Sequence, residues 1–225
     1  MRLLWSPRSP FVRKVMILVY ELGLQDRIDC VRAVAVPRGA PNPVITAENP
    51  LGKIPVLLRD GLPPLYDSRV IAEALIALVP DGDGDGERLL PASGEARLTQ
   101  LRWQALGDGL TDNLLLWRIE RTGASGGDPG TMASYRAKVI ATLAALEREA
   151  DALAEAPFGL GAIAILCALG QLDFRYRTSG WRSAHPRLAA WAARQATRPS
   201  LVATAVQDDI GSDEGPVMDL VFGGG

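Results

Sequence analysis

Residues 9–23 read SPFVRKVMILVYELG, a segment with the start and stop signals of one helix. Ser9 is a residue type that caps helix N-termini, and Pro10 suits the first helical position, where no N–H donor is needed. Gly23 suits the left-handed position at which helices end. The apolar residues Val12, Val15, Met16 and Val19 share one face. The pattern predicts a helix over residues 10–22 that packs this face into a core.

The segments around this helix have the patterns of strands and of one further helix. Short apolar runs bounded by turn residues predict strands, and the turn Arg59-Asp60-Gly61 joins two of them as a hairpin. The Pro-rich residues 37–43 are expected to form a loop. The expected elements are strands 2–5 and 28–36, hairpin strands 54–58 and 62–66, and a helix from 68 to about 79. The order β-α-β followed by β-β-α predicts an α/β layer with a mixed sheet.

The sequence DGDGDG at residues 81–86 marks a change of composition. Alternating aspartates and glycines bury nothing, so we expect a linker at 80–92 between domains at 1–79 and 93–225. The run also imitates the start of an EF-hand calcium loop, but the position of the bidentate glutamate falls on Ala92. A linker without calcium is therefore the expectation.

Beyond the linker, apolar residues follow a helical period almost everywhere. Residues 156–172 form an uncharged run that is too short and too rich in glycine for a membrane span, and they predict a buried core helix. The expected helices cover residues 96–121, 131–154, 158–176 and 186–196. The second domain is therefore expected to be all-helical.

The composition excludes several classes of partner. With a net charge of -2 over 225 residues, the chain lacks the basic surface that nucleic acid or an anionic membrane requires. Its two cysteines, Cys30 and Cys167, are expected to be buried reduced thiols, and with the one histidine, His185, they are too few for a zinc site. No metal is expected. No signal-peptide pattern opens the sequence, so we expect a cytoplasmic protein whose partners are small molecules or proteins.

Ser9 is also a candidate for chemistry. A helix N-terminus presents unpaired N–H groups and the positive end of the helix dipole, so it can hold an anion. A serine hydroxyl at this place can donate to a thiolate sulfur and favour the ionised form of a thiol. The alternative is that Ser9 only caps its helix.

The segment NPLGKIPVL, residues 49–57, has the features of a ligand-binding loop before a strand. Pro55 is compatible with a cis bond, which would turn the main chain of Ile54 toward a ligand, although an ordinary edge-strand proline is the simpler interpretation. Lys53 is a mobile cation that suits a carboxylate.

The segment LYDSRVIAEAL, residues 65–75, begins a helix with two polar residues. The helix N–H groups and Ser68 could bind a ligand's carboxylate while Asp67 binds its ammonium group. The same pair is also a common helix cap.

Five motifs follow one another in a specific order and spacing. They are SPF at 9–11, NPLGKIPVL, DSRVIAEAL, LCALGQLDFR at 166–175 and HPRLAAWAARQATRPSL at 185–201. Together they resemble a bacterial glutathione S-transferase. The resemblance implies a thioredoxin-like α/β N-terminal domain, an all-α helical C-terminal domain, a homodimer, and glutathione as co-substrate.

The resemblance also implies roles for individual residues. The main chain of Ile54, before a cis Pro55, would pair with the cysteinyl part of glutathione. Asp67 and Ser68 would hold the γ-glutamyl end, and Lys53 would face the glycyl carboxylate. A hydrophobic electrophile would lie between the domains, near Phe11, Trp103, Leu106, Asp108 and Leu110. Trp103 and Leu106 are equally compatible with core positions.

Spacing separates the two serines of SPRS, residues 6–9. In the tau, zeta and omega classes, the catalytic serine or cysteine stands fourteen positions before the glycine that ends the first helix, and the same count back from Gly23 gives Ser9. Ser6 is the alternative, because Ser-Pro-Arg-Ser imitates the CPxC spacing of glutaredoxins. Without a thiol at either position disulfide exchange is not possible, which argues against a glutaredoxin or an omega-like reductase.

The predicted function is activation of the glutathione thiolate for attack on a small hydrophobic electrophile, by a detoxifying transferase or a related isomerase, dehalogenase or lyase. The alternative is a member of the same fold that binds glutathione or hydrophobic ligands, or docks on other proteins, with little turnover. A hydrolase with Ser9 as nucleophile and His185 as base lacks a GxSxG-type turn, and His185 is expected to be a surface or capping residue.

One departure from the family pattern concerns stability. The buried sixth helix of the family usually opens with a Ser/Thr-x-x-Asp capping box, but residues 159–162 read GLGA. Both capping side chains are missing, which is expected to cost about 1 kcal/mol.

Overall fold

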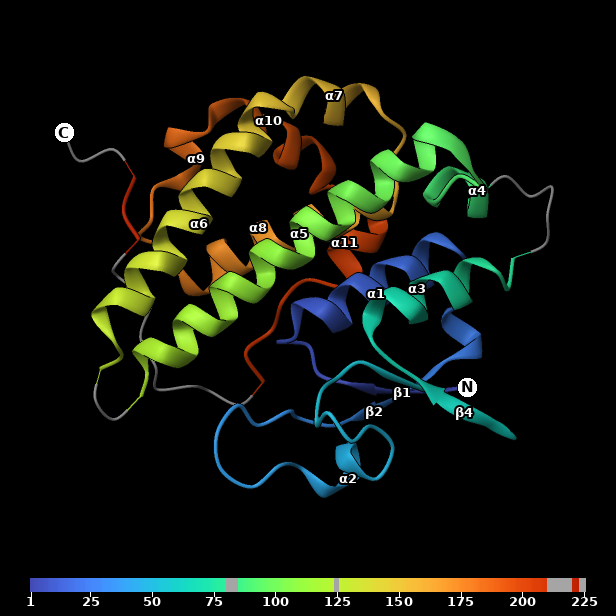
Figure 1. The fold of residues 1–225 in the computed structure, drawn as a ribbon. Coiled ribbons are helices and arrows are strands. Elements are labelled where there is room, and N and C mark those ends of the chain that lie inside the picture. Colours follow the sequence, from blue (N-terminus) through green and yellow to red (C-terminus); the bar gives the residue numbers. More distant parts are fainter. Residues whose placement is uncertain (80–84, 124–125, 210–219, 223–225) are drawn as a thin grey trace. The chain divides into compact units, whose positions relative to one another are not determined.

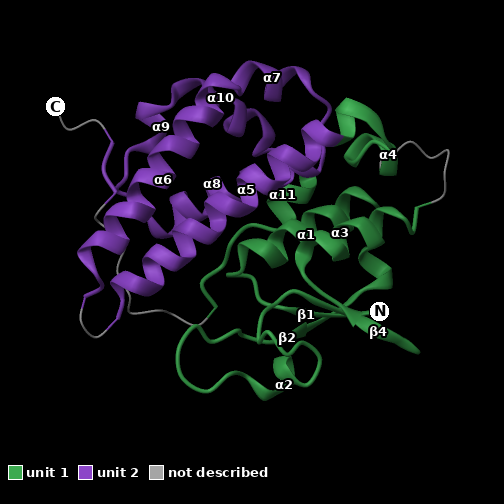
Figure 2. Cartoon of the chain, viewed as in Figure 1, with its two compact units in different colours: residues 1–97, 199–209 green, residues 98–198, 210–225 purple. Residues whose placement is uncertain are grey.

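The computed structural model describes residues 1–79, 85–123, 126–209 and 220–222. The chain forms two compact units (Figure 2). The first contains Met1–Arg97 and Pro199–Asp209, and the second contains Leu98–Arg198 and Ile210–Gly225. The domain boundaries drawn from the sequence stay a prediction. Residues 80–84 of the predicted linker, with the first four positions of the candidate calcium loop, lie outside the described residues.

The first unit is built on a four-stranded sheet (Figure 1). The strands are β1 (Arg2–Trp5), β2 (Asp29–Arg32), β3 (Val56–Arg59) and β4 (Leu62–Leu65), in the spatial order β2-β1-β3-β4. β2 is parallel to β1, whereas β1 with β3 and β3 with β4 are antiparallel, so the predicted mixed sheet and its hairpin are confirmed. β2 is shorter than the predicted strand because its partner β1 ends at Trp5, which pairs with Arg32.

Helices cover both faces of this sheet. α1 (Pro10–Glu21) and α3 (Ser68–Ile76) pack together on one face, and α2 (Pro43–Thr46) lies on the other (Figure 1). Successive strand residues point to opposite faces and supply both cores. Leu3 and Leu57 pack with the apolar faces of α1 and α3, whereas Leu4 and Val56 belong to a second cluster with Ile45 of α2. This is the thioredoxin-like arrangement that the family resemblance implies.

Three short helices complete the first unit: η1 (Gln25–Arg27), α4 (Asp85–Leu89) and α11 (Pro199–Ala203). α4 lies within the segment that the sequence predicts to be a linker. α11 packs against α1, where Ser200 Oγ donates to Glu21 Oε1 at 2.5 Å and Arg13 Nη2 donates to the Leu201 carbonyl oxygen at 3.5 Å. Residues close to the C-terminus therefore complete the N-terminal unit.

The second unit is all-helical, as predicted. Its helices are α5 (Gly94–Arg121, which starts in the first unit), α6 (Pro129–Arg148), α7 (Ala150–Glu155), α8 (Leu160–Arg175), α9 (Trp181–Ala184) and α10 (Pro186–Gln195). The predicted helix over 131–154 is two helices, α6 and α7, which meet at Glu149. Glu149 interrupts the helix with φ −92° and ψ 4°.

α8 is the buried core helix that the uncharged run predicts, and almost all of its side chains are buried. It approaches α5 closely at two glycines. A Cβ on Gly107 would lie 2.5 Å from the Ala164 carbonyl carbon, and a Cβ on Gly161 would lie 2.5 Å from the Trp103 Cβ. Any side chain at either glycine would therefore push the two helices apart.

The N-terminus of α8 has no cap from its own side chains, as residues 159–162 predict. α5 supplies the cap instead, because Gln100 Oε1 accepts a buried hydrogen bond of 2.9 Å from the Gly161 N–H. One of the otherwise unpaired N–H groups of the helix start is satisfied in this way. The missing capping box is therefore replaced, in part, by a side chain from another helix.

Candidate functional site

The predicted site residues of the first unit meet at one end of the sheet. β1 runs toward this end, and Leu4 pairs with Val56 of the antiparallel β3, so the start of β3 lies there too. Leu57 pairs with Leu65, which places the end of β4 at the same edge. The β1–α1 turn, the loop before β3 and the start of α3 therefore all lie at this end.

Ser9 is the N-cap of α1, as predicted. Its backbone is extended (φ −82°, ψ 120°), and its Oγ accepts a hydrogen bond of 3.3 Å from the Val12 N–H. This bond uses a lone pair of the hydroxyl and leaves its hydrogen available for donation. Ser9 is partly exposed, so a bound anion could meet the hydroxyl and the helix N-terminus together.

Ser6 lies in a different environment. It is only 3% exposed, and it lines a cavity of about 150 Å³ within the first unit together with Met16, Cys30 and Ala203. Ser9 is not among the described residues that line this cavity. The two serines of SPRS therefore face different surroundings, and Ser9 is the one whose hydroxyl caps α1.

The loop between α2 and β3 contains three of the predicted glutathione contacts. The Ile54–Pro55 peptide is cis, and both residues are buried, whereas the Lys53 side chain is exposed. Val56 is the first residue of β3 to pair with β1, so the main chain of Ile54 lies beyond the last ladder pair. The residue order therefore places Lys53 and Ile54 immediately before the sheet, at the end where Ser9 lies.

Asn49 holds this loop, and sequence reasoning missed it. The residue is 1% exposed. Its Oδ1 accepts from the Leu51 N–H at 3.0 Å, and its Nδ2 donates to the Lys53 carbonyl oxygen at 2.9 Å. The only signal in the sequence is the Asn-Pro pair, which is typical of a turn and does not reveal which main-chain groups the amide reaches.

Asp67 and Ser68 begin α3, as predicted. Asp67 is the N-cap, and its Oδ1 accepts from the Arg69 N–H at 2.9 Å. The Asp67 side chain is exposed, whereas Ser68 is 2% exposed. A helix N-terminus attracts a carboxylate, and the Asp67 carboxylate attracts an ammonium group, so the pair suits the zwitterionic end of an amino acid.

The residues predicted to contact an electrophile have varied surroundings. Phe11 in α1 and Leu106 in α5 are partly exposed. Trp103, Asp108 and Leu110 in α5 are buried. Their role in an electrophile pocket stays a prediction.

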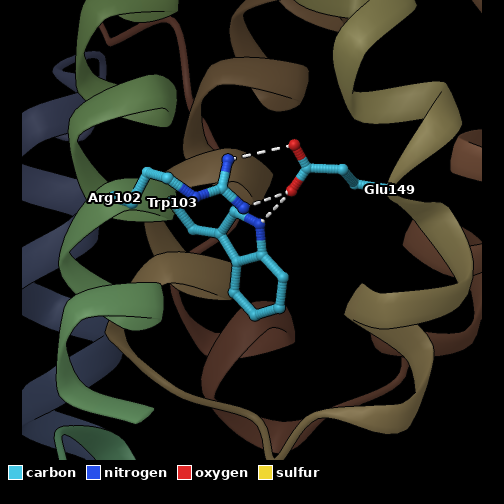
Figure 3. A network of polar contacts seen from close by, with 3 residues as sticks. All are labelled: Arg102, Trp103 and Glu149. Atoms are coloured by element: carbon cyan, nitrogen blue, oxygen red, sulfur yellow. Dashed lines mark hydrogen bonds and ion pairs between the residues drawn. The ribbon is translucent and has the colours of Figure 1, made fainter. Parts of the chain in front are cut away.

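Trp103 takes part in a polar network inside the second unit, shown in Figure 3. Its Nε1 donates to Glu149 Oε2 at 2.6 Å, and Arg102 donates to both oxygens of the same carboxylate, at 3.0 and 2.5 Å. The Arg102 bond is the largest cause that holds the pKa of Glu149 below its ordinary value, and the Trp103 bond acts in the same direction. Trp103 therefore links α5 to the junction of α6 and α7.

The prediction that Cys30 is buried is wrong, whereas Cys167 is buried as expected. Cys30 lies on the edge strand β2, which leaves its side chain exposed, and its Sγ is 3.8 Å from the Met16 Sδ. Partial desolvation of the thiol, with a smaller contribution from Asp29, raises the pKa of Cys30. A raised pKa leaves little thiolate at neutral pH, so Cys30 is a weak nucleophile.

The expectation that His185 is a surface residue is wrong, because its side chain is 7% exposed, whereas the capping alternative holds for position alone: His185 is the N-cap residue of α10 but makes no side-chain cap bond. Its Nδ1 lies 3.1 Å from the Trp181 carbonyl oxygen, and its ring meets Phe222 edge-on at 5.0 Å. The start of α10 is capped by Glu147 instead, whose carboxylate accepts from the N–H groups of the second and third helical residues at 3.0 and 2.8 Å.

The described residues contain neither a candidate metal site nor a candidate membrane-spanning helix. In that part of the chain, no group of three or more His, Cys, Asp or Glu side chains is arranged to hold a metal ion. Nor does any helix described there combine the length and the apolar character needed to cross a bilayer.

Comparison with protein families gives two matches. Residues 8–78 match the glutathione S-transferase N-terminal domain, and residues 118–194 match the glutathione S-transferase C-terminal domain. The chain is also similar to the uncharacterized GST-like protein YibF of Escherichia coli strain K12. The two are 32% identical over 209 residues, which is 91% of this chain and 98% of YibF.

Solved structures give the same family. A glutathione transferase family member from Pseudomonas fluorescens Pf-5, with bound glutathione, is 38% identical with a TM-score of 0.85, over 92% of this chain and 98% of that chain. A glutathione S-transferase from Methylobacillus flagellatus KT, also with glutathione bound, is 32% identical with a TM-score of 0.78, over 92% of this chain and 99% of that chain.

Proposed function

This chain belongs to the glutathione S-transferase family, and from that premise we propose that it binds glutathione, ionises its thiol and transfers the sulfur to a small hydrophobic electrophile. The main observation behind this proposal is the Ser9 hydroxyl at the N-terminus of α1. The sheet register places Ser9 at the same end as the loop before β3 and the start of α3.

In the proposed complex, each part of glutathione has a partner in the first unit. Asp67 and Ser68 bind the γ-glutamyl ammonium and carboxylate, because the start of α3 offers an exposed acid beside a helix N-terminus. The main chain of Ile54 pairs with the cysteinyl part, and Lys53 faces the glycyl carboxylate. Two solved structures similar to this chain contain glutathione, which supports the choice of ligand. The proposal includes a homodimer, as the family resemblance implies.

Ser9 can cap its helix and assist the thiolate at once. The cap uses an oxygen lone pair, while the hydroxyl hydrogen donates to the glutathione sulfur. An unperturbed thiol has a pKa of roughly 8.5, so at pH 7 a decrease of one unit makes about a quarter of it thiolate and a decrease of two units about three quarters. The donated hydrogen bond and the α1 dipole both favour the anion.

The transfer step follows from the ionised sulfur. The thiol proton passes to solvent, and a sulfur lone pair forms the new bond to an electrophilic carbon. With an aryl halide, the halide leaves with the electrons of the carbon–halogen bond. The protein contributes position and electrostatic stabilisation, and the scheme needs no covalent bond between protein and substrate.

Substitution of Ser9 by alanine tests this proposal. We expect the thiol of bound glutathione to titrate about one to two pH units higher than in the unaltered protein, and kcat/KM with an aryl halide to fall roughly 10- to 100-fold. The thiolate is followed by its ultraviolet absorbance over a pH titration, and turnover by product absorbance.

Two matched variants separate chemistry from helix capping. S9G retains most of the cap stability, within a few tenths of a kcal/mol, and removes the hydroxyl, so it should behave like S9A in the titration. S6A removes the other serine of SPRS and should leave the thiol titration unchanged. If S9A and S9G bind glutathione with an unchanged thiol pKa and full turnover, Ser9 is a cap alone. If the unaltered protein binds glutathione without lowering its thiol pKa, the non-catalytic alternative is correct.

A further inference from the structure

The loop from 47 to 55 connects α2 to β3 and contains Lys53 and Ile54, two of the proposed glutathione contacts. Neither residue lies in a helix or a strand, so neither is held by regular secondary structure. A binding contact on such a loop is only as well placed as the groups that fix the loop. The contacts that fix this loop are therefore part of the site.

Asn49 is tied to the chain by both its side chain and its main chain. Its N–H donates to the Ile45 carbonyl oxygen at 2.7 Å, and its carbonyl oxygen accepts from the Gly52 N–H at 3.0 Å. Its side-chain amide adds the bonds to Leu51 N–H and to the Lys53 carbonyl oxygen. One buried residue thus anchors the loop to the end of α2 and reaches across the turn to its far side.

The bond from Asn49 to the Lys53 carbonyl fixes a peptide group that glutathione is proposed to use. That carbonyl belongs to the peptide linking Lys53 to Ile54, which is trans. In a trans peptide the C=O and N–H point in opposite directions. With the carbonyl held toward Asn49, the Ile54 N–H is directed away from it.

Asn42 makes the same kind of contacts at another place. Its Oδ1 accepts from the Val44 N–H at 3.0 Å, and its Nδ2 donates to the Val34 carbonyl oxygen at 3.1 Å. These bonds connect α2 to the chain that follows β2, and none of them touches the peptide between Lys53 and Ile54. Asn42 is therefore a matched control for Asn49.

We propose that Asn49 is a positioning residue for glutathione. Its side-chain donor fixes the Lys53–Ile54 peptide. This peptide then presents the Ile54 N–H to the cysteinyl part of glutathione, and it fixes the main-chain position from which the Lys53 side chain extends. The inference rests on the proposed function, because it assigns a role in binding the same ligand. Asn49 itself touches neither sulfur nor electrophile, so its effect is expected on binding and not on the chemical step.

The test compares N49A with N42A, using glutathione and an aryl halide. We expect N49A to raise KM for glutathione about tenfold, the effect of losing roughly one hydrogen-bonded contact, with kcat at saturating glutathione changed less than about twofold. N42A also removes two side-chain hydrogen bonds to the main chain, and it should leave KM for glutathione within about twofold. Calorimetric titration should give the same result for Kd: the Kd for glutathione rises about tenfold in N49A and changes less than about twofold in N42A.

N49D tests the donor bond separately from the acceptor bond, and circular dichroism establishes that each variant folds. Aspartate keeps an acceptor for the Leu51 N–H but replaces the donor to the Lys53 carbonyl with an oxygen, so KM for glutathione should still rise about tenfold. Equal KM values for N49D and unaltered protein would overturn the positioning role alone. Equal increases in N49A and N42A would overturn it too, since both would then report general destabilisation. Absence of glutathione binding by the unaltered protein would overturn the proposed function itself.

Discussion

Glu149 is a single carboxylate that joins three helices of the second unit. It stands between α6 and α7 and bonds Arg102 and Trp103 of α5 (Figure 3). The Arg102 contact is partly exposed, which weakens it, whereas Trp103 is buried and donates from the core side. The ionised form of Glu149 is therefore favoured in the folded protein, in agreement with its lowered pKa.

The E149Q variant should reveal this contact as a pH-dependent stability. Because the folded-state pKa is depressed, the carboxylate stabilises the fold above its unfolded-state pKa of about 4.3, and this contribution is lost as the pH falls through the folded-state pKa. At pH 7 we expect E149Q to be less stable by about 1 kcal/mol, and the difference should shrink as the pH falls below about 5. Urea unfolding at stepped pH measures it.

E155Q is the matched control, since it removes an exposed carboxylate from α7 and reports the general effect of one negative charge. A stability difference between E149Q and the unaltered protein that stays constant from pH 7 to pH 3 would contradict the assigned role of the ionised carboxylate.

Single residues differ in how well the sequence predicts them. The caps at Ser9 and Asp67 could be predicted because capping depends on neighbours two or three positions away. The exposure of Cys30 and the burial of His185 could not, because each depends on which distant elements lie beside the residue. Asn49 was missed for the same reason, since an Asn-Pro pair does not show which carbonyl its amide will reach.

The start of α8 shows how one helix can depend on another. Its N-cap position is Gly159, which has no side chain to offer, and the Gly161 N–H is paired by Gln100 of α5. Gly161 must be small because its Cβ would meet Trp103 and Gln100. The close approach of α5 and α8 at Gly161 therefore also brings Gln100 within reach of the Gly161 N–H.

The Q100M variant tests that arrangement. Methionine keeps the volume of the side chain but offers no comparable acceptor, so the buried Gly161 N–H is left unpaired. We expect the free energy of unfolding to fall by about 1–3 kcal/mol. Urea unfolding measures the change, and faster hydrogen exchange at the Gly161 amide would locate it.

Q100E is the control for Q100M, because glutamate restores an acceptor oxygen beside a helix N-terminus, where a negative charge is favourable. It should recover part of the loss. If Q100M is as stable as the unaltered protein, the contact from Gln100 contributes nothing to the start of α8.

Long helices could be predicted well, and short helices could not. α1, α5, α8 and α10 have sustained apolar periods and clear boundaries, and they match the predicted helices closely. α2 has only four residues, too few to show a period, and it forms because Asn42 caps it and Ile45 is buried beneath the sheet. The break between α6 and α7 lies at Glu149, whose side chain bonds α5, and no local pattern reveals it.

For the whole chain, the order of elements predicts an α/β layer followed by helices, and both are present. What the order does not show is that Pro199–Asp209 belong to the first unit. Residues of this segment bond α1, the turn before it and the edge strand β2: Ser200 pairs with Glu21, Asp208 with Arg8, and Asp209 with Arg32. The position of Pro199–Asp209 depends on contacts with residues far away in the sequence, and hydrophobic periodicity does not reveal such contacts.

The first unit should therefore depend on a side chain near the other end of the chain. Leu201 in α11 is 5% exposed, and its helix packs on α1. We expect L201A to lower the free energy of unfolding by about 2–4 kcal/mol and to speed hydrogen exchange in α1 while the amides of α8 stay protected.

L188A makes the same change at a fully buried leucine of α10 in the second unit, and it should speed exchange in α10 while α1 stays protected. Equal loss of protection in both units for both variants would mean that the residues after Pro199 do not stabilise the first unit in particular.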